Sequence, residues 1–267
     1  MLLRREIIDS LEAMAVSRSG VVIVHTSLRT IGPIEGGAEG LLDALISYVT
    51  GEGGLLCIPT HTWAYQDDPT VPTLDLMEQR SNLGVFPNVA LRDPRGVRTL
   101  HPTHSMAVFG PPCRVAEFVA GEERIETTTS PKGCYGKIHR DGGQVLLLGV
   151  GQDKNTYLHC VEEMLGVGNR ISETPITLTV RHPDGRIEPR RLYPLEAVGI
   201  ADVSEQFPNY EPAFRYHGCI TDGVLGNAPV QLCSVRGMTE VMKRIFRRSE
   251  GRELLFDATP IPTAYYM

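Results

Sequence analysis

Apolar residues along the first two-thirds of the chain alternate between two kinds of spacing. Where they recur every three or four residues, as Ile7, Leu11 and Met14 do, they predict an amphipathic helix. On this basis, helices are predicted over residues 2–17, 41–49 and 155–165. Short unbroken aliphatic runs instead predict buried strands, over residues 21–25, 53–59, 106–109 and 145–150. The alternation of the two element types predicts an α/β fold.

The last third of the chain carries a different pattern. Two segments of alternating polarity within residues 175–193 flank an Asp184-Gly185 turn, which is typical of an antiparallel hairpin. The remaining elements, two strands and a closing amphipathic helix, are predicted over residues 216–220, 230–233 and 235–248. The sequence therefore predicts a layered α/β/α arrangement with a mixed, partly parallel sheet and an antiparallel hairpin in the C-terminal third.

The composition narrows the classes of protein to which this chain can belong. Its 267 residues are 42% hydrophobic and 22% charged, as in a folded globular protein, and we expect a single domain over 1–267 with only a weak boundary near residue 170. No run of about 18 apolar residues predicts a membrane helix, and the charged N-terminal stretch does not match a secretory signal. Six scattered cysteines predict reduced thiols and a cytoplasmic location. A net charge of −6 argues against a general nucleic-acid binder.

The turn after the predicted strand 21–25 is a first candidate for chemistry. His25 ends the strand, and hydroxyl residues and glycines then lead into a helix. Backbone N–H groups in such a turn suit a phosphate or a developing oxyanion, and Arg29 is able to pair with phosphate. The segment matches neither the P-loop nor the G-x-G-x-x-G pattern. The alternative is an ordinary strand–turn–helix corner that needs glycine for its backbone.

His101 and His104 form a second candidate. Two histidines at i and i+3 suggest a metal site when they share a helical face. Pro102 disfavours a helix at this point, and no cysteine or carboxylate stands at ligand spacing. No metal is therefore expected, and each histidine is expected to be a hydrogen-bonded structural residue.

His159 and Glu162 form a third candidate, on a predicted helix for which Asp153 or Asn155 is the expected N-cap. Residues at i and i+3 lie on one helical face, and Glu163 at i+4 is the alternative partner. A carboxylate beside a histidine orients the ring and stabilises its protonated form, as a general base requires. The alternative is an ion pair on the surface of the helix.

The segment between residues 60 and 83 is polar and contains proline, so it is expected to be a long loop. It includes Trp63, the single tryptophan, and the acidic pair Asp67-Asp68. Aromatic and acidic side chains together attract an ammonium group. The alternative is a solvated loop with Trp63 packed against the body of the protein.

Taken in order, these segments resemble the aminoglycoside 3-N-acetyltransferase family. Seven stretches between residues 20 and 245 carry the resemblance: VHTSLRTIGPIEGGAEGLLDAL, GGLLCIPTHTW, LGVFPNVALRDP, HPTHSMAVFG, SPKGCYGKI, VLLLGVGQDKNTYLHCVEE and HGCITDGVLGNAPVQLCSV. Each stretch alone is a weak signal, and seven in the right order are a specific one. The resemblance implies transfer of an acetyl group from acetyl-coenzyme A to an amine.

The resemblance also implies roles for particular residues. In the family, the histidine of the N-T-x-L-H segment is regarded as the catalytic base; it matches His159, and the acidic residue after it matches Glu162. The coenzyme A side of the site is expected to include His25, Thr26, Ser27, Leu28, Arg29, Val85, Phe86 and Ser105. The amine side is expected to include His104, Asp67, Glu163 and Thr156. Backbone N–H groups of residues 26–29, or the Ser105 hydroxyl, are the expected donors to an oxyanion.

The chain also departs from the family pattern. It is short compared with several resistance enzymes, and the segments after Trp63 and Asn169 do not supply the full acidic lining expected for a polycationic aminoglycoside. The acceptor is therefore either an aminoglycoside or another small amine. The expected partners are this amine and coenzyme A, in a monomer or homodimer that binds no nucleic acid, membrane or metal. Two alternatives remain: a catalytically silent coenzyme A-binding module, and a metal-dependent hydrolase built on His101, His104 and a cysteine.

Overall fold

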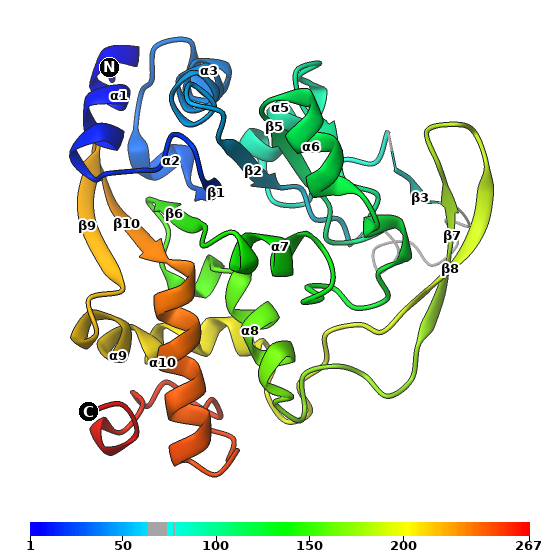
Figure 1. Cartoon of the computed structure of the whole chain (residues 1–267), viewed down its shortest axis with the longest axis vertical. Coiled ribbons are helices and arrows are strands. Elements are labelled where there is room, and N and C mark those ends of the chain that lie inside the picture. Colours follow the sequence, from blue (N-terminus) through cyan, green and yellow to red (C-terminus); the bar gives the residue numbers. More distant parts are fainter. Residues whose placement is uncertain (64–73, 77) are drawn as a thin grey trace.

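A seven-stranded mixed sheet runs through the computed structural model, in the order β4-β5-β2-β1-β6-β10-β9 (Figure 1). The structure describes residues 1–63, 74–76 and 78–267. The strands of this sheet are β1 (Val21–Thr26), β2 (Leu55–Pro59), β4 (Val97–Arg98), β5 (Met106–Phe109), β6 (Gln144–Leu148), β9 (Ile220–Leu225) and β10 (Ala228–Ser234). The central strand β1 pairs in parallel with β2 and β6, whereas the outer pairings are antiparallel. Helices cover both faces of the parallel centre, which is why its strands are unbroken aliphatic runs.

Helices form the two outer layers of the molecule. They are α1 (Arg4–Ala13), α2 (Leu28–Ile31), α3 (Gly37–Val49), α5 (Val85–Arg92), α6 (Pro112–Val119), α7 (Cys134–Arg140), α8 (Tyr157–Leu165), α9 (Glu211–Tyr216) and α10 (Val235–Arg248). The described residues also form 3₁₀ segments: η1 (Glu122–Arg124), η2 (Gln152–Lys154), η3 (Val203–Tyr210) and η4 (Thr263–Tyr265). In the part of the chain that the structure describes, no helix combines the length and apolar character needed to cross a bilayer.

Successive residues of β1 face opposite helical layers because side chains alternate along a strand. Val22 and Val24 pack with residues of α1, α3 and α5, and Val21 and Ile23 pack with residues of α7, α8 and α10. The predicted α/β/α layering and the mixed, partly parallel sheet are therefore confirmed.

The predicted hairpin is also confirmed, and it lies in a second, smaller sheet. Strands β7 (Ile176–Arg181) and β8 (Ile187–Leu192) pair antiparallel, and β3 (Leu74–Asp75) pairs in parallel with β7. Gly185 has a φ of +82° in the connecting turn, as the Asp-Gly pattern predicts. The hairpin projects from the layered body at the right of Figure 1.

The strand predicted over residues 216–220 is wrong. Tyr216 instead ends α9, and β9 begins only at Ile220. Pro212 in the first turn suits the start of a helix, and Gly218, with a φ of +65°, follows its end.

The helix predicted over residues 155–165 is present, but it begins two residues later than predicted. It begins at Tyr157, and its N-cap is Thr156 rather than Asp153 or Asn155. The preceding residues form the 3₁₀ turn η2, which delays the helix.

Candidate active site

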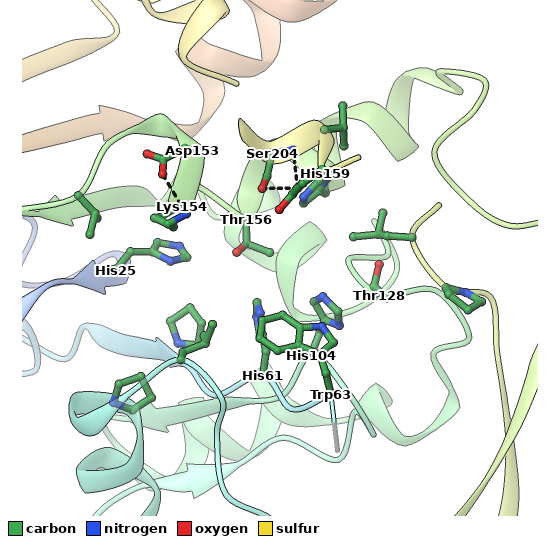
Figure 2. Close-up of a pocket in the computed structure, with 18 of the residues that line it drawn as sticks. His25, His61, Trp63, His104, Thr128, Asp153, Lys154, Thr156, His159 and Ser204 are labelled. Atoms are coloured by element: carbon green, nitrogen blue, oxygen red, sulfur yellow. Dashed lines mark hydrogen bonds and ion pairs between the residues drawn. The ribbon is translucent and has the colours of Figure 1, made fainter. Parts of the chain in front are cut away.

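A cavity of about 610 Å³ opens at the carboxyl ends of the parallel strands β1 and β2 (Figure 2). His25 and Thr26 reach it from the end of β1, and Pro59 reaches it from the end of β2. The wall across from them includes His159 of α8 and residues of η3. This edge of a parallel sheet is where α/β proteins commonly bind their ligands.

His25 is placed on the cavity wall by the strand that carries it. Because side chains alternate along β1, its ring lies on the same face as Val21 and Ile23, which is the face that α8 covers. The residue is only 8% exposed, and its Nε2 has no hydrogen-bond partner among the described residues. Burial lowers the pKa of His25 to about 4, so the ring is neutral at pH 7. It is therefore available to hydrogen-bond a molecule in the cavity.

The turn between β6 and α8 positions the cavity wall that carries His159. Gly149 has a φ of +69°, and a Cβ there would lie 2.9 Å from the Cβ of Thr30. Only glycine at this position therefore allows the chain to pass so close to α2. Asn155 Nδ2 then donates to Gln152 Oε1 at 2.8 Å, which ties the start of α8 to η2. His159 follows one turn later on the cavity side of the helix.

His159 and Glu162 make the i, i+3 contact that the sequence predicts. Nδ1 of His159 lies 3.3 Å from Oε2 of Glu162, and Glu162 is only 1% exposed behind the ring. Because a carboxylate only accepts hydrogen bonds, Nδ1 carries the hydrogen and Nε2 keeps its lone pair. The ring also packs against Phe207 of η3, with 4.7 Å between ring centroids. This arrangement holds a histidine with a free Nε2 lone pair at the wall of a cavity.

Two further charged residues continue from this pair, and the first of them, Arg170, also lines the cavity. Arg170 Nε donates to Glu162 Oε1 at 2.5 Å, and its two terminal nitrogens donate to the carboxylate of Glu253 at 2.6 and 2.9 Å. Burial opposes the charge of Arg170, but its hydrogen bonds to Glu253 and the charge of Glu162 raise the pKa above its usual value. Sequence spacing does not reveal this set, because Glu253 is 83 residues from Arg170 and no local pattern links them.

Histidines also form the opposite wall. The rings of His61 and His104 lie 4.3 Å apart between centroids, and burial lowers the pKa of each well below its usual value. His61 Nε2 hydrogen-bonds the Tyr135 hydroxyl at 2.9 Å. Behind them, Nδ1 of His101 accepts the backbone N–H of His104 at 2.8 Å, and its Nε2 donates to the Thr127 carbonyl at 3.0 Å. Both nitrogens of His101 are thus engaged, and the described residues include no cluster of three His, Cys, Asp or Glu able to hold a metal ion.

The other expected site residues divide into two groups. Those that line the cavity are Thr26, Phe86 and Thr156. Those that do not are Ser27, Leu28, Arg29, Val85, Ser105 and Glu163. Ser105 is fully buried and donates to the Thr60 carbonyl at 3.1 Å, and Glu163 accepts from the Thr127 hydroxyl at 2.7 Å. Asp67 lies outside the described residues.

Acidic side chains lie on the cavity wall at positions that no sequence motif indicated. Glu196 and Asp202, from the segment between α8 and η3, both line the cavity. The Asp202 carboxylate is oriented by the N–H and hydroxyl of Ser204, at 2.9 and 2.6 Å. Asp153 lines it too and pairs with Lys154 at 2.9 Å; Figure 2 shows this pair and Ser204 near His159. The region after Asn169 thus contributes two acidic residues to the cavity wall.

Comparison with known proteins agrees with this geometry. The family model for aminoglycoside 3-N-acetyltransferase matches residues 23–247. Aminoglycoside N(3)-acetyltransferase IV from Salmonella sp is 36% identical over 165 residues, which span 61% of this chain and 60% of that enzyme. Aminoglycoside N(3)-acetyltransferase III from Serratia marcescens is 26% identical over 242 residues, which span 83% of this chain and 88% of that enzyme.

Solved structures extend the comparison to the fold. A variant of aminoglycoside acetyltransferase AAC(3)-IVa in complex with a gentamicin is 28% identical, with a TM-score of 0.72 over 90% of this chain and 86% of that one. The structure of AAC-IIIb with CoASH shares the fold at 21% identity, with a TM-score of 0.76 over 89% of this chain and 93% of that one. The family match contains both histidine walls of the cavity and continues through most of α10. The chain therefore belongs to the aminoglycoside 3-N-acetyltransferase family.

Proposed function

We propose that this protein transfers the acetyl group of acetyl-coenzyme A to an amine of an aminoglycoside or a similar polyamine, with His159 as the base. The observation that carries the proposal is the His159 ring, which lines the cavity while its Nδ1 is held by the Glu162 carboxylate. The relatives support it, since they are named as aminoglycoside N(3)-acetyltransferases, and one solved relative is a complex with CoASH. We place the reaction in the cytoplasm, in a monomer or homodimer.

The base is needed because the attacking nitrogen must lose a proton as it becomes an amide. Amine pKa values lie near 8–10, so most of the acceptor is protonated at pH 7; it loses one proton to solvent, and the neutral form attacks the thioester. As the new C–N bond forms, Nε2 of His159 takes the proton that the nitrogen releases. Glu162 stabilises the resulting imidazolium through Nδ1. When the C–S bond breaks, the same proton passes to the departing thiolate, so the ring returns to its neutral state.

The tetrahedral intermediate needs a hydrogen-bond donor for its oxyanion. The expected donors are placed poorly for this: the Ser105 hydroxyl already donates to Thr60, and the Ser27 N–H donates to the Leu148 carbonyl at 2.9 Å. His25 is a better candidate, because its buried Nε2 lines the cavity without a partner among the described residues. A neutral imidazole at this position offers an N–H without adding charge to the site.

The charges on the cavity wall favour a polycationic acceptor. Glu196, Asp202 and Asp153 are carboxylates on the wall, and Asp153 is paired with Lys154. Unreacted ammonium groups of the acceptor would be stabilised beside Glu196 and Asp202 while the reacting amine lies at His159. The cavity thus supports a substrate with several amines over one with a single amine.

An acceptor screen tests the proposal. Wild-type protein, acetyl-coenzyme A and a panel of amines are assayed by release of free thiol, with 2-deoxystreptamine antibiotics and simple monoamines in the same panel. We expect turnover with polyamines, loss of turnover in His159→Ala, and coenzyme A binding by calorimetry in both proteins. Binding of coenzyme A without turnover of any amine would instead indicate a silent binding module.

A further inference from the structure

A chain of alternating charges lies behind His159, and nearly all of it is buried. Glu162 is 1% exposed and Arg170 is 3% exposed. The Arg170 guanidinium donates through Nε to Glu162 and through both terminal nitrogens to Glu253, so all three of its nitrogens are engaged. Glu253 follows α10 and lies beyond residues 23–247, where the family match ends. The outermost member of the chain of charges is therefore contributed by a segment outside the matched region.

The charges in this set do not balance while His159 is neutral. Glu162 and Glu253 contribute two negative charges and Arg170 contributes one positive charge, which leaves the set at −1. Uncompensated charge away from water is costly, so the set favours one more proton. His159, in contact with Glu162, is the member that is able to take it. Without the Glu253 charge, the set would already be neutral with an uncharged ring.

We infer that Glu253 is a positioning residue that raises the basicity of His159 through Arg170 and thereby sets the lower pH limit of acetyl transfer. This inference rests on the proposed role of His159 as the base. Glu253 contacts neither the His159 ring nor the cavity. It acts through Arg170, which bonds Glu162, the residue that contacts His159.

The contact geometry makes two effects act in the same direction. Glu253 adds negative potential to the set, which favours a protonated His159. It also accepts hydrogen bonds from both terminal nitrogens of Arg170, whose guanidinium bonds Glu162 through Nε. The other oxygen of Glu162, Oε2, contacts His159. Glu253 is itself held by the backbone N–H groups of Leu254 and Leu255, at 3.0 and 2.9 Å. Both the charge and its position are thus defined by the fold.

Other titratable groups lie around the ring and its charged partners. Those that face His159 or its charged partners are His61, His104, Tyr210, Asp202, Asp153 and Lys154. Burial lowers the pKa of His61 and His104 and raises that of Tyr210, so all three are neutral near pH 7. Asp202 is held by Ser204, and the other two residues pair with each other. Of these groups, only Tyr210 is affected by the charge of Glu253, which adds to the larger effect of burial, so Tyr210 stays neutral near pH 7.

Glu253→Gln tests the inference because it removes the charge and keeps the side-chain size. In protein labelled with ¹⁵N-histidine, the His159 signal is identified by its absence from His159→Ala, and its titration midpoint is followed by NMR. We expect the midpoint, and the acid limb of the kcat/KM profile, to move down by about 0.5 pH unit. Glu250→Gln, at an exposed glutamate in the same segment, is the matched control and should move neither.

A folded Glu253→Gln protein whose His159 midpoint stays fixed or moves up would overturn the inference. Should this variant fail to fold, Glu253→Ser leaves room for water at Arg170 and carries the same expectation. Glu253→Asp keeps the charge and should keep most of the wild-type midpoint. The NMR titration needs no turnover, so it decides about Glu253 even if His159→Ala proves active and the proposed base is rejected.

Discussion

The layered body and the projecting hairpin each contain a buried histidine paired with a glutamate. In the hairpin, Nε2 of His182 lies 2.8 Å from Glu188, and Arg186 donates to the same carboxylate at 2.5 Å. In the body, His159 contacts Glu162, which Arg170 contacts in turn. The two sites share the same three residue types in the same order of contact.

Their surroundings differ. The Glu188 and Arg186 side chains are 32% and 55% exposed, whereas Glu162 and Arg170 are almost fully buried. His182 does not line the cavity; its pair joins the two ends of the β7–β8 turn. A histidine–glutamate contact therefore suits catalysis only where it borders a cavity from which water can be displaced, because electrostatic effects are strong there.

Removing each histidine gives the largest contrast between the two pairs. His159→Ala should lower kcat for acetyl transfer by about 10²–10⁴-fold, which is the usual contribution of a general base. His182→Ala should keep a rate close to that of the wild type, because neither His182 nor Glu188 lines the cavity. Thiol release under saturating acetyl-coenzyme A measures both. Near-normal turnover in His159→Ala would refute the assigned base.

Removing each arginine separates buried from exposed ion pairs. Arg170→Met leaves two carboxylates without their shared cation, and should lower the free energy of unfolding by about 3–5 kcal/mol. Arg186→Met breaks a partly exposed pair and should cost no more than about 1 kcal/mol. Urea denaturation followed by circular dichroism gives both values. Equal losses would mean that burial does not distinguish the two networks.

Neutralising each glutamate tests orientation of the ring. Glu162→Gln keeps the side-chain shape but removes the anion that stabilises the imidazolium, and should lower kcat by about 10–100-fold. KM for acetyl-coenzyme A should change little, because Glu162 does not line the cavity. Glu188→Gln is the matched control in the hairpin. An unchanged kcat in Glu162→Gln would leave His159 without its proposed partner.

The smallest expected effect concerns pH and His25. Its folded pKa of about 4 lies below the unfolded value of 6.5, so the unfolded chain binds the extra proton first. Stability from this residue is present above pH 6.5 and is lost as the pH falls towards 4. On acidification, His25→Asn should therefore lose about 1–3 kcal/mol less free energy of unfolding than the wild type. Urea titrations at pH 5 and pH 7 test this, and an identical pH dependence in variant and wild type would contradict it.

The predicted elements agree best with the structure where packing follows local periodicity. The strand at residues 106–109 and the helix at residues 235–248 have the bounds that the sequence predicts. The strand predicted from Tyr216 fails because Tyr216 ends a short helix, and an apolar run this short does not distinguish a helix from a strand. A single domain over 1–267 remains a prediction.

The roles of individual residues also remain predictions, but their placement can be compared with the sequence. The His159–Glu162 contact could be predicted from the sequence because both residues lie on one helix with fixed geometry. Phe86 and His104 reach the cavity as the resemblance implies, while Ser105 and Glu163 point into other contacts. Neighbours in sequence thus differ in direction, which motif matching alone does not resolve.

By itself, the sequence determined the alternation of strands and helices, the buried parallel centre, the hairpin and the pairing of a histidine with a glutamate one turn away. Each of these follows from patterns of residues that are close together in the sequence. Only the tertiary structure decided that Arg170 and Glu253 stand behind that pair, and that Glu196 and Asp202 border the same cavity. These contacts join segments that are distant along the chain, and their geometry depends on how whole layers pack, which no local spacing encodes.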